Sequence, residues 1–126
     1  MNDTKTTLQE LKTLVKNMVD KREWSQFHSP KNLACNISIE ANELLEKFVW
    51  IDSKESYAEM DNNRQDIQDE LADIIIASIC FANGNNIDLT QAITHKLEEI
   101  KKKYPVELSK GKKDKYTAYK KIKDNS

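Results

Sequence analysis

The sequence predicts an all-α protein built as a bundle of four helices. Its 126 residues include only 2 Gly and 2 Pro, which leaves little material for turns. Charged residues make up 33% and hydrophobic residues 38% of the chain, a balance that suits amphipathic helices. Apolar residues also recur at three- and four-residue steps in four separate segments. The length predicts a single domain over 1–126, with a core over about 6–105 and a lysine-rich arm over 106–126.

The first two helices follow from apolar spacing and from capping residues. A helix over about 6–21 presents one packing stripe, which consists of Leu8, Leu11, Leu14, Val15 and Met18. Ser29 followed by Pro30 is typical of an N-cap with proline at the first helical position. The second helix is therefore expected to run from Pro30 to about Trp50.

The third and fourth helices flank a short polar break. The third, over about 64–83, is so apolar between Ile74 and Ala82 that it is expected to be buried nearly all round. The polar, aperiodic segment 51–65 before it is interpreted as a loop with one extra turn, long enough to act as a lid or to reach a neighbouring subunit. Asp88, with Gln91 three residues later, predicts the N-cap of the fourth helix, which ends before Pro105.

Composition and charge limit the classes of partner that the protein is expected to bind. The chain has no apolar stretch of about 18 residues and no signal-peptide pattern, so a cytoplasmic protein without a membrane partner is expected. Residues 1–95 carry 9 basic and 16 acidic side chains, whereas 96–126 carry 11 lysines and 5 acids. The acidic larger part argues against nucleic acid as a partner, and the lysine-rich end could supply cations for phosphate. The isolated Cys35 and Cys80 are expected to be buried thiols in a reducing compartment.

Two pairs of acids stand inside apolar runs. Glu40 and Glu43 lie three residues apart in "SIEANELLEKFVW", and Glu70 and Asp73 are spaced alike in "DELADIIIAS". Four carboxylates that converge in an apolar environment repel one another unless a cation compensates them. Acids at positions i and i+3 on two facing helices would form an oxygen-only site, which suits Mg²⁺.

Two alternatives compete with a magnesium site. Either acid pair, taken alone, is common on exposed helix surfaces in ordinary ion pairs. A di-iron bundle would need Glu-x-x-His pairs, and neither His28 nor His95 has an acid three residues before it. The presence of two acid pairs on successive helices favours the magnesium site.

Three segments together carry a resemblance to a known family: they read "REWSQFHSPKNLACNISIEANELLEKFVW", "DELADIIIASICFANGNNIDL" and "KKKYPVELSKGKKDKYT". Together they resemble the MazG-like nucleoside triphosphate pyrophosphohydrolases, in particular the dCTP pyrophosphatase branch. The resemblance extends from about Leu8 to Thr117 with the segments in the same order. It implies an all-α fold, Mg²⁺ as cofactor, and cleavage of a nucleoside triphosphate between the α and β phosphates to monophosphate and pyrophosphate. Mn²⁺ could substitute for Mg²⁺.

The resemblance also implies residue roles. It makes Glu40, Glu43, Glu70 and Asp73 metal ligands and catalytic residues, and Glu46, at the same spacing, a catalytic residue that assists indirectly or orients water. The expected substrate-binding residues are Trp24, Ser25, Gln26, Phe27, His28, Trp50, Lys103, Lys110, Lys115 and Tyr116. Taken without the family, the two tryptophans would be core or interface residues and His28 a structural residue.

Two departures leave the preferred base open. Where the dCTP branch has a histidine in the first helix this chain has Val15, and where it has a tyrosine four residues after the last metal ligand this chain has Ala77. Loss of the tyrosine could open space for a larger base, so dCTP, dATP or both are the expected substrates.

The expected function is therefore magnesium-dependent house-cleaning of the deoxynucleoside triphosphate pool. A homodimer or a dimer of dimers is expected, because so short a chain cannot easily cover its apolar third helix. The alternative is a non-catalytic helical oligomerisation or regulatory module that keeps the acids for structure.

Overall fold

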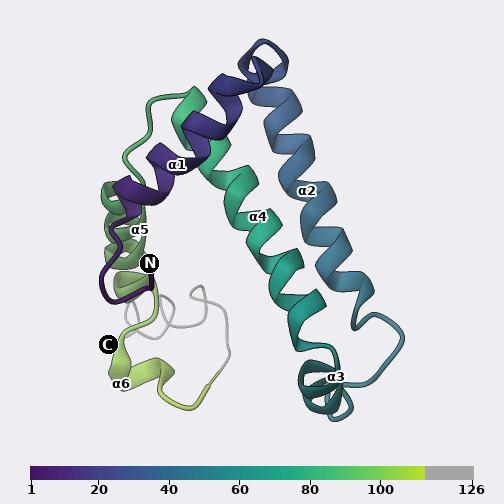
Figure 1. Cartoon of the computed structure of the whole chain (residues 1–126). Coiled ribbons are helices and arrows are strands. Elements are labelled where there is room, and N and C mark those ends of the chain that lie inside the picture. Colours follow the sequence, from purple (N-terminus) through teal and green to yellow (C-terminus); the bar gives the residue numbers. More distant parts are fainter. Residues whose placement is uncertain (113–126) are drawn as a thin grey trace. The chain divides into compact units, whose positions relative to one another are not determined.

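The computed structural model describes residues 1–112, all of whose regular elements are helical (Figure 1). In chain order these are α1 (Leu8–Lys21), the 3₁₀ turn η1 (Trp24–Phe27), α2 (Pro30–Glu46), α3 (Ser56–Asn62), α4 (Arg64–Gly84), α5 (Leu89–Lys103) and α6 (Val106–Ser109). The predicted all-α class is confirmed. None of the described helices has the length and apolar character needed to cross a bilayer.

The helix starts form as the capping residues predict. The Ser29 hydroxyl accepts a hydrogen bond from the Asn32 N–H at 3.1 Å, so α2 begins at Pro30. The Asp88 carboxylate accepts from the Gln91 N–H at 2.9 Å at the start of α5. Each bond satisfies a backbone donor that the first helical turn leaves unpaired.

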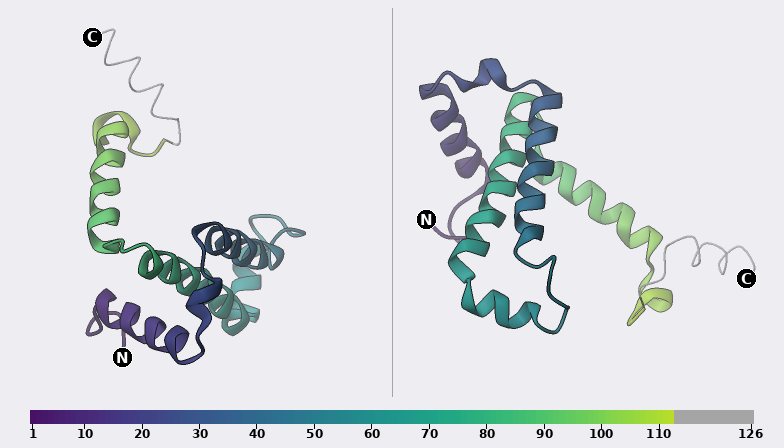
Figure 2. Two further views of the ribbon diagram at one scale, coloured as in Figure 1. Left: turned by 90° about the horizontal axis from the view of Figure 1, so that it is seen from above. Right: turned by 90° about the vertical axis from the view of Figure 1, so that its right-hand side faces the viewer.

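Residues 1–87 form one compact unit that contains α1 to α4, and a second unit begins at Asp88. Within the first unit, α2 and α4 lie side by side and antiparallel in every view (Figures 1 and 2). Helix α1 packs against α4, where the Asn83 amide donates to the Lys12 carbonyl at 3.0 Å and the Lys12 ammonium donates to the Ile87 carbonyl at 2.8 Å. These two bonds fix the end of α4 against α1.

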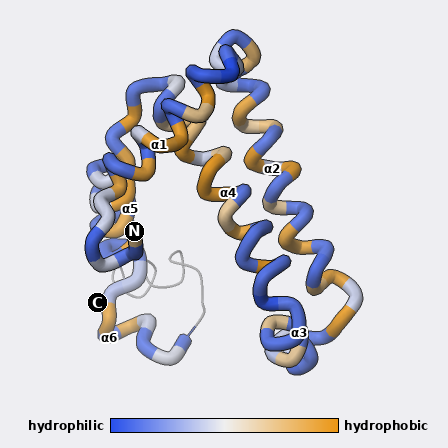
Figure 3. The backbone as a smooth tube through the Cα atoms, in the orientation of Figure 1, coloured by the Kyte–Doolittle hydropathy of each residue, from blue (hydrophilic) through white to orange (hydrophobic). Residues whose placement is uncertain are grey.

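The buried core of the described chain is small. Only six hydrophobic side chains among residues 1–112 are buried: Val19 of α1, Leu33 of α2, and Ile67, Ala77, Ile79 and Ala82 of α4. The expectation that α4 is buried nearly all round is wrong for the chain as described, because Leu71, Ile75 and Ile76 stay 40–50% exposed. Figure 3 shows that α4 is mainly hydrophobic at its end near α1 and mainly hydrophilic at its end near α3.

Four further expectations need correction. Helix α2 ends at Glu46, short of Trp50, and the 51–65 segment holds the seven-residue helix α3 where one extra turn was expected. The extended arm after Pro105 begins with the short helix α6. Cys35 is exposed and Cys80 only partly buried, so neither thiol is the fully buried residue expected.

Candidate active site

Helices α2 and α4 bring the two predicted acid pairs together. Glu40 and Glu43 lie one turn apart on α2, and Glu70 and Asp73 lie one turn apart on α4. One carboxylate oxygen from each of the four residues lies within 4.8 Å of those of the other three. The side-by-side packing of α2 and α4 makes this possible, because it places both acid pairs at the same level of the helix pair.

The acids belong to a longer stripe along α4. Glu70, Asp73, Ala77, Cys80 and Gly84 alternate at steps of three and four residues, which places them on one face of the helix. At the end of α4, a Cβ on Gly84 would lie 3.6 Å from the Leu33 side chain of α2. The interface between α2 and α4 is thus apolar at one end and acidic toward the other.

Two oxygens of the carboxylate cluster are left without a hydrogen-bond partner within the described chain. Glu40 Oε2 and Glu70 Oε2 are both buried, and neither has a hydrogen-bond partner among the described residues. Hydrogen bonding to Glu40 and the charge of Glu40 raise the pKa of Glu43. Burial, followed by the hydrogen bond and charge of Glu43, raises the pKa of Glu70. The raised pKa values of Glu43 and Glu70 mean that close packing of carboxyl groups disfavours their charged forms, and two buried oxygens without a partner in an all-carboxylate set fit a hard divalent cation.

Lys47 is a neighbour of this cluster that the predictions missed. It caps the C-terminus of α2, is half-buried, and follows Glu43 by four residues. Its positive charge opposes the rise in the pKa of Glu70. The i, i+4 spacing from Glu43 was the available sequence signal, since residues four apart on a helix share a face.

Glu46 and Trp50 lie outside the cluster of four. Glu46 is exposed at the last residue of α2 and does not join the converging oxygens. Trp50 follows the helix and is 92% exposed, so within residues 1–112 its indole is not packed into a pocket.

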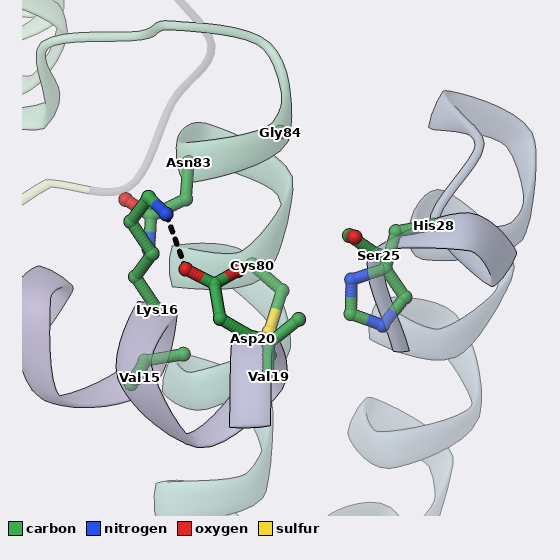
Figure 4. A pocket seen from close by; sticks show the side chains of 9 residues that line it. All are labelled: Val15, Lys16, Val19, Asp20, Ser25, His28, Cys80, Asn83 and Gly84. Atoms are coloured by element: carbon green, nitrogen blue, oxygen red, sulfur yellow. Dashed lines mark hydrogen bonds and ion pairs between the residues drawn. The ribbon is translucent and has the colours of Figure 1, made fainter. Parts of the chain in front are cut away.

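A cavity of about 340 Å³ opens between α1, η1 and the end of α4 (Figure 4). Ser25 and His28 stand on one side of it, facing Val19, Asp20 and Cys80 across the opening. The full lining comprises Val15, Lys16, Val19, Asp20, Ser25, His28, Cys80, Asn83 and Gly84. Lys16 and Asp20 form an ion pair on this wall. The cavity therefore offers charged, hydroxyl, imidazole and amide groups.

The predicted substrate-binding residues of η1, and His28 after it, divide between this cavity and the surface. Ser25 and His28 line the cavity. Trp24 and Phe27 are 45% and 62% exposed and are not among its lining residues. Gln26 lines a separate open hollow together with Asp20, Glu23 and Ser25.

The cavity and the carboxylates are neighbours along α4. Cys80 follows Asp73 by seven residues on the same face, which corresponds to about 10 Å at 1.5 Å rise per residue. Of the two positions that depart from the dCTP branch, Val15 lines the cavity, whereas Ala77 is buried with 2% of its surface exposed. The space that the missing tyrosine was expected to open at Ala77 is therefore filled by helix packing in this chain.

The predicted basic residues fall elsewhere in the chain. Lys103, at the end of α5, is half-buried, and Lys110, after α6, is exposed; both belong to the second compact unit. Lys115 and Tyr116 lie outside the described residues.

An all-helical fold with four converging carboxylates defines the class of the all-α pyrophosphohydrolases, and solved structures and curated sequences agree with that class. A pyrophosphatase from Archaeoglobus fulgidus superposes with a TM-score of 0.76 at 32% identity, covering 83% of this chain and 98% of that one. The MazG-like family matches residues 35–118, and this chain belongs to that family.

Curated proteins named dCTP pyrophosphatase 1 are also similar to this chain. The chain is 36% identical over 113 residues to dCTP pyrophosphatase 1 of Bos taurus, covering 88% of this chain and 67% of that protein. It is 35% identical to the Mus musculus protein and 31% identical to the Homo sapiens protein of the same name, covering 66% of each. The chain thus spans about two thirds of the length of these relatives. They support the predicted enzyme class, a hydrolase that acts on nucleoside triphosphates.

Proposed function

We propose that the chain is a Mg²⁺-dependent hydrolase that cleaves deoxynucleoside triphosphates between the α and β phosphates, releasing monophosphate and pyrophosphate. The observation that carries this proposal is the convergence of four carboxylate oxygens within 4.8 Å on α2 and α4. Family membership and the dCTP pyrophosphatase relatives support the substrate class. House-cleaning of the nucleotide pool is the role that such a reaction serves.

Glu40, Glu43, Glu70 and Asp73 would hold the cation, with Mn²⁺ as a substitute. When bound, Mg²⁺ neutralises charge on the triphosphate oxygens and makes a neighbouring water more acidic. The buried Oε2 atoms of Glu40 and Glu70 supply the ligand atoms that the described chain leaves unsatisfied. Glu46, exposed one turn beyond Glu43, is proposed to orient the attacking water or to accept its proton.

The cavity beside η1 is proposed to take the nucleoside. His28 and Ser25 offer hydrogen-bonding groups on one wall, and the Lys16–Asp20 ion pair lies on the other. Trp24, Phe27 and Trp50 would supply aromatic faces to the base, and Gln26 a polar edge. Val15 leaves more room than the histidine of the dCTP branch, so dATP is proposed as a substrate beside dCTP.

Cations near the acids are proposed to bind the phosphates. Lys47 acts on Glu70 electrostatically from the end of α2. The lysine-rich end would add Lys103, Lys110 and Lys115, with Tyr116 packing nearby. Positive charge is needed because the described chain has no glycine-rich phosphate loop.

A homodimer, or a dimer of dimers, is proposed as the active assembly. The exposed apolar side chains of α4 form, together with α1, a groove of about 460 Å³ whose lining is mainly hydrophobic. Its main apolar members are Leu11, Val15, Leu71, Ile75, Ile76 and Ile79. A second copy that covers this groove would complete the burial that α4 lacks in a single chain.

The decisive experiment is incubation with a panel of canonical and modified nucleotides and Mg²⁺, measuring pyrophosphate and monophosphate separately. Pyrophosphate and monophosphate should appear in equal amounts, whereas release of orthophosphate would refute cleavage between the α and β phosphates. Glu40→Gln should abolish turnover with helix content unchanged, because it removes one charged ligand. Glu98→Gln, an exposed acid on α5, is the matched control and should retain full activity.

The rival function, a non-catalytic helical module, predicts a different response to magnesium. A chain that keeps its acids only for structure should show no pyrophosphate release and no stabilisation by divalent cations. A rise in melting temperature with Mg²⁺ that Glu40→Gln abolishes would exclude this rival.

A further inference from the structure

The connection between α1 and α2 folds back on itself at Glu23. This residue has φ 54° and ψ 35°, in the left-handed region that side chains other than glycine and asparagine rarely adopt. The Gln26 side-chain amide donates to the Glu23 carbonyl at 2.9 Å and so braces the turn. The reversal at Glu23 brings Trp24, the first residue of η1, back toward the end of α1.

Arg22 meets Trp24 across this turn. The Arg22 guanidinium carbon lies 5.7 Å from the centroid of the Trp24 ring, which is within the range of a cation–π contact. Arg22 Nη1 also donates to the Met18 carbonyl at 3.1 Å, one turn back on α1. The guanidinium is thus tied to the helix and to the indole at once, and it fixes the ring relative to α1.

The contact leaves part of the indole accessible. Trp24 remains 45% exposed although a guanidinium covers one face of its ring. Ser25, its neighbour in η1, lines the cavity proposed to hold the nucleoside. An indole held on one face and open elsewhere, in the residue next to Ser25 of that cavity, is suited to stack on a flat nucleobase.

We propose that Arg22 is a positioning residue for nucleotide recognition, holding Trp24 in the orientation in which its open face receives the base. This inference rests on the proposed function, since it assigns Arg22 a role at the same nucleotide site. Arg22 acts through Trp24: it does not touch the phosphates or the four carboxylates. Loss of the guanidinium leaves the indole free to rotate, so binding of the base weakens while the chemistry at the carboxylates is unaffected.

The test compares Arg22→Met with Arg22→Lys and with Lys21→Met, which removes an equal charge from the adjacent exposed position. Arg22→Met should raise KM for the preferred nucleotide about two- to fivefold, the scale of an exposed cation–π contact. Its kcat, Mg²⁺ affinity and pyrophosphate affinity should stay unchanged. Arg22→Lys should recover most of the loss, since an ammonium can also stand over the ring, and Lys21→Met should behave as the unmodified chain. In a Trp24→Leu background, Arg22→Met should add no further effect.

Fluorescence gives a readout that a purely structural role would not change. A Trp50→Phe background keeps an aromatic ring at position 50 and leaves Trp24 as the remaining tryptophan, so its quenching by added dATP or dCTP, compared within this background, reports nucleotide binding at Trp24. Arg22→Met should shift the emission of Trp24 and weaken this quenching by the same factor as KM rises. The proposal would be overturned if Arg22→Met lowered the affinity for pyrophosphate. It would also be overturned if Arg22→Met raised KM by the same factor in the chain with Trp24 and in the Trp24→Leu background.

Different results would refute the proposed function and the role of Arg22. If no nucleotide yields pyrophosphate, the proposed function is refuted, and the fluorescence titration alone decides on Arg22. Unchanged nucleotide quenching in Arg22→Met, or no quenching by either nucleotide in the parent background, would refute the role of Arg22.

Discussion

At the scale of single residues, the pKa values of Glu43 and Glu70 reflect how closely the candidate site packs its carboxyl groups. Each lies among other carboxylates, and the pKa of each is raised above its ordinary value of 4.5, mainly by Glu40 for Glu43 and mainly by burial for Glu70. A raised carboxyl pKa means that the folded chain binds a proton more tightly than the unfolded chain does. Protons and divalent cations therefore compete for the same oxygens.

This competition predicts opposite pH responses with and without magnesium. In EDTA, Glu43 and Glu70 contribute stability below about pH 4.5, and that contribution is lost as pH rises through their raised folded-state pKa values. With saturating Mg²⁺ the ionised forms are favoured, so the cation contributes most near neutral pH and least in acid. The difference in melting temperature between Mg²⁺ and EDTA should therefore shrink as pH falls from about 7.5 to about 4.5.

Groups that titrate without contacting magnesium contribute equally in Mg²⁺ and in EDTA, so they cancel in the difference between the two melting temperatures. Glu43→Gln removes one of the neighbouring carboxyls and should flatten the pH dependence of this difference. Glu98→Gln should leave that pH dependence unchanged. A magnesium effect that is constant with pH, or that grows in acid, would contradict cation binding at these carboxylates.

At the scale of helices, the elements that have strong local signals were predictable and those that depend on their neighbours were not. Ser29 with Pro30, and Asp88, fixed two helix starts because capping is a local interaction. Helix α2 was predicted four residues too long, since the apolar Phe48 and Val49 continue its pattern after the helix ends. Helix α3 is short and polar, and helices of that length need tertiary contacts, which it makes with α4.

The same distinction holds within the site. The four carboxylates were predictable because a three-residue spacing reads directly as one helix face. The contrasting surroundings of Val15 and Ala77 were not, because they depend on how α1, α2 and α4 pack.

The packing around positions 15 and 77 predicts different costs in stability when each is given the residue that the dCTP branch has. Ala77→Tyr forces a large ring into a buried position and should destabilise the fold by about 1 to 3 kcal/mol. Val15→His places an imidazole at the cavity wall, where space exists, and should cost less than about 1 kcal/mol. Urea denaturation followed by circular dichroism measures both values.

Selectivity provides the second readout for this pair. Because Val15→His narrows the cavity, kcat/KM for dATP should fall relative to kcat/KM for dCTP, which competition assays measure. An unchanged ratio would show that the base does not occupy this cavity. A fully stable Ala77→Tyr would show that the α2–α4 interface has room that the described packing lacks.

At the scale of the whole molecule, the described residues leave several large apolar side chains of α4 exposed. The face of α4 that carries Leu71, Ile75 and Ile76 borders the groove shared with α1. The apolar run from Ile74 to Ala82 predicted that α4 is buried nearly all round, but such a run cannot tell whether a side chain is covered by its own chain or by another. Val15 lines both this groove and the candidate nucleoside cavity, so an interface on the groove would lie next to the site.

The proposed interface predicts that a single charge in the groove changes the assembly. Ile75→Glu should raise the dissociation constant of the homo-oligomer about tenfold or more, because burial of an unpaired carboxylate is costly. Ile39→Glu, on α2 and 55% exposed, is the matched control and should leave the assembly intact. Sedimentation velocity over a concentration series measures both, with circular dichroism to verify helix content. A parent chain that is monomeric at every concentration, or an assembly broken by Ile39→Glu and not by Ile75→Glu, would exclude the α1–α4 groove as the contact surface.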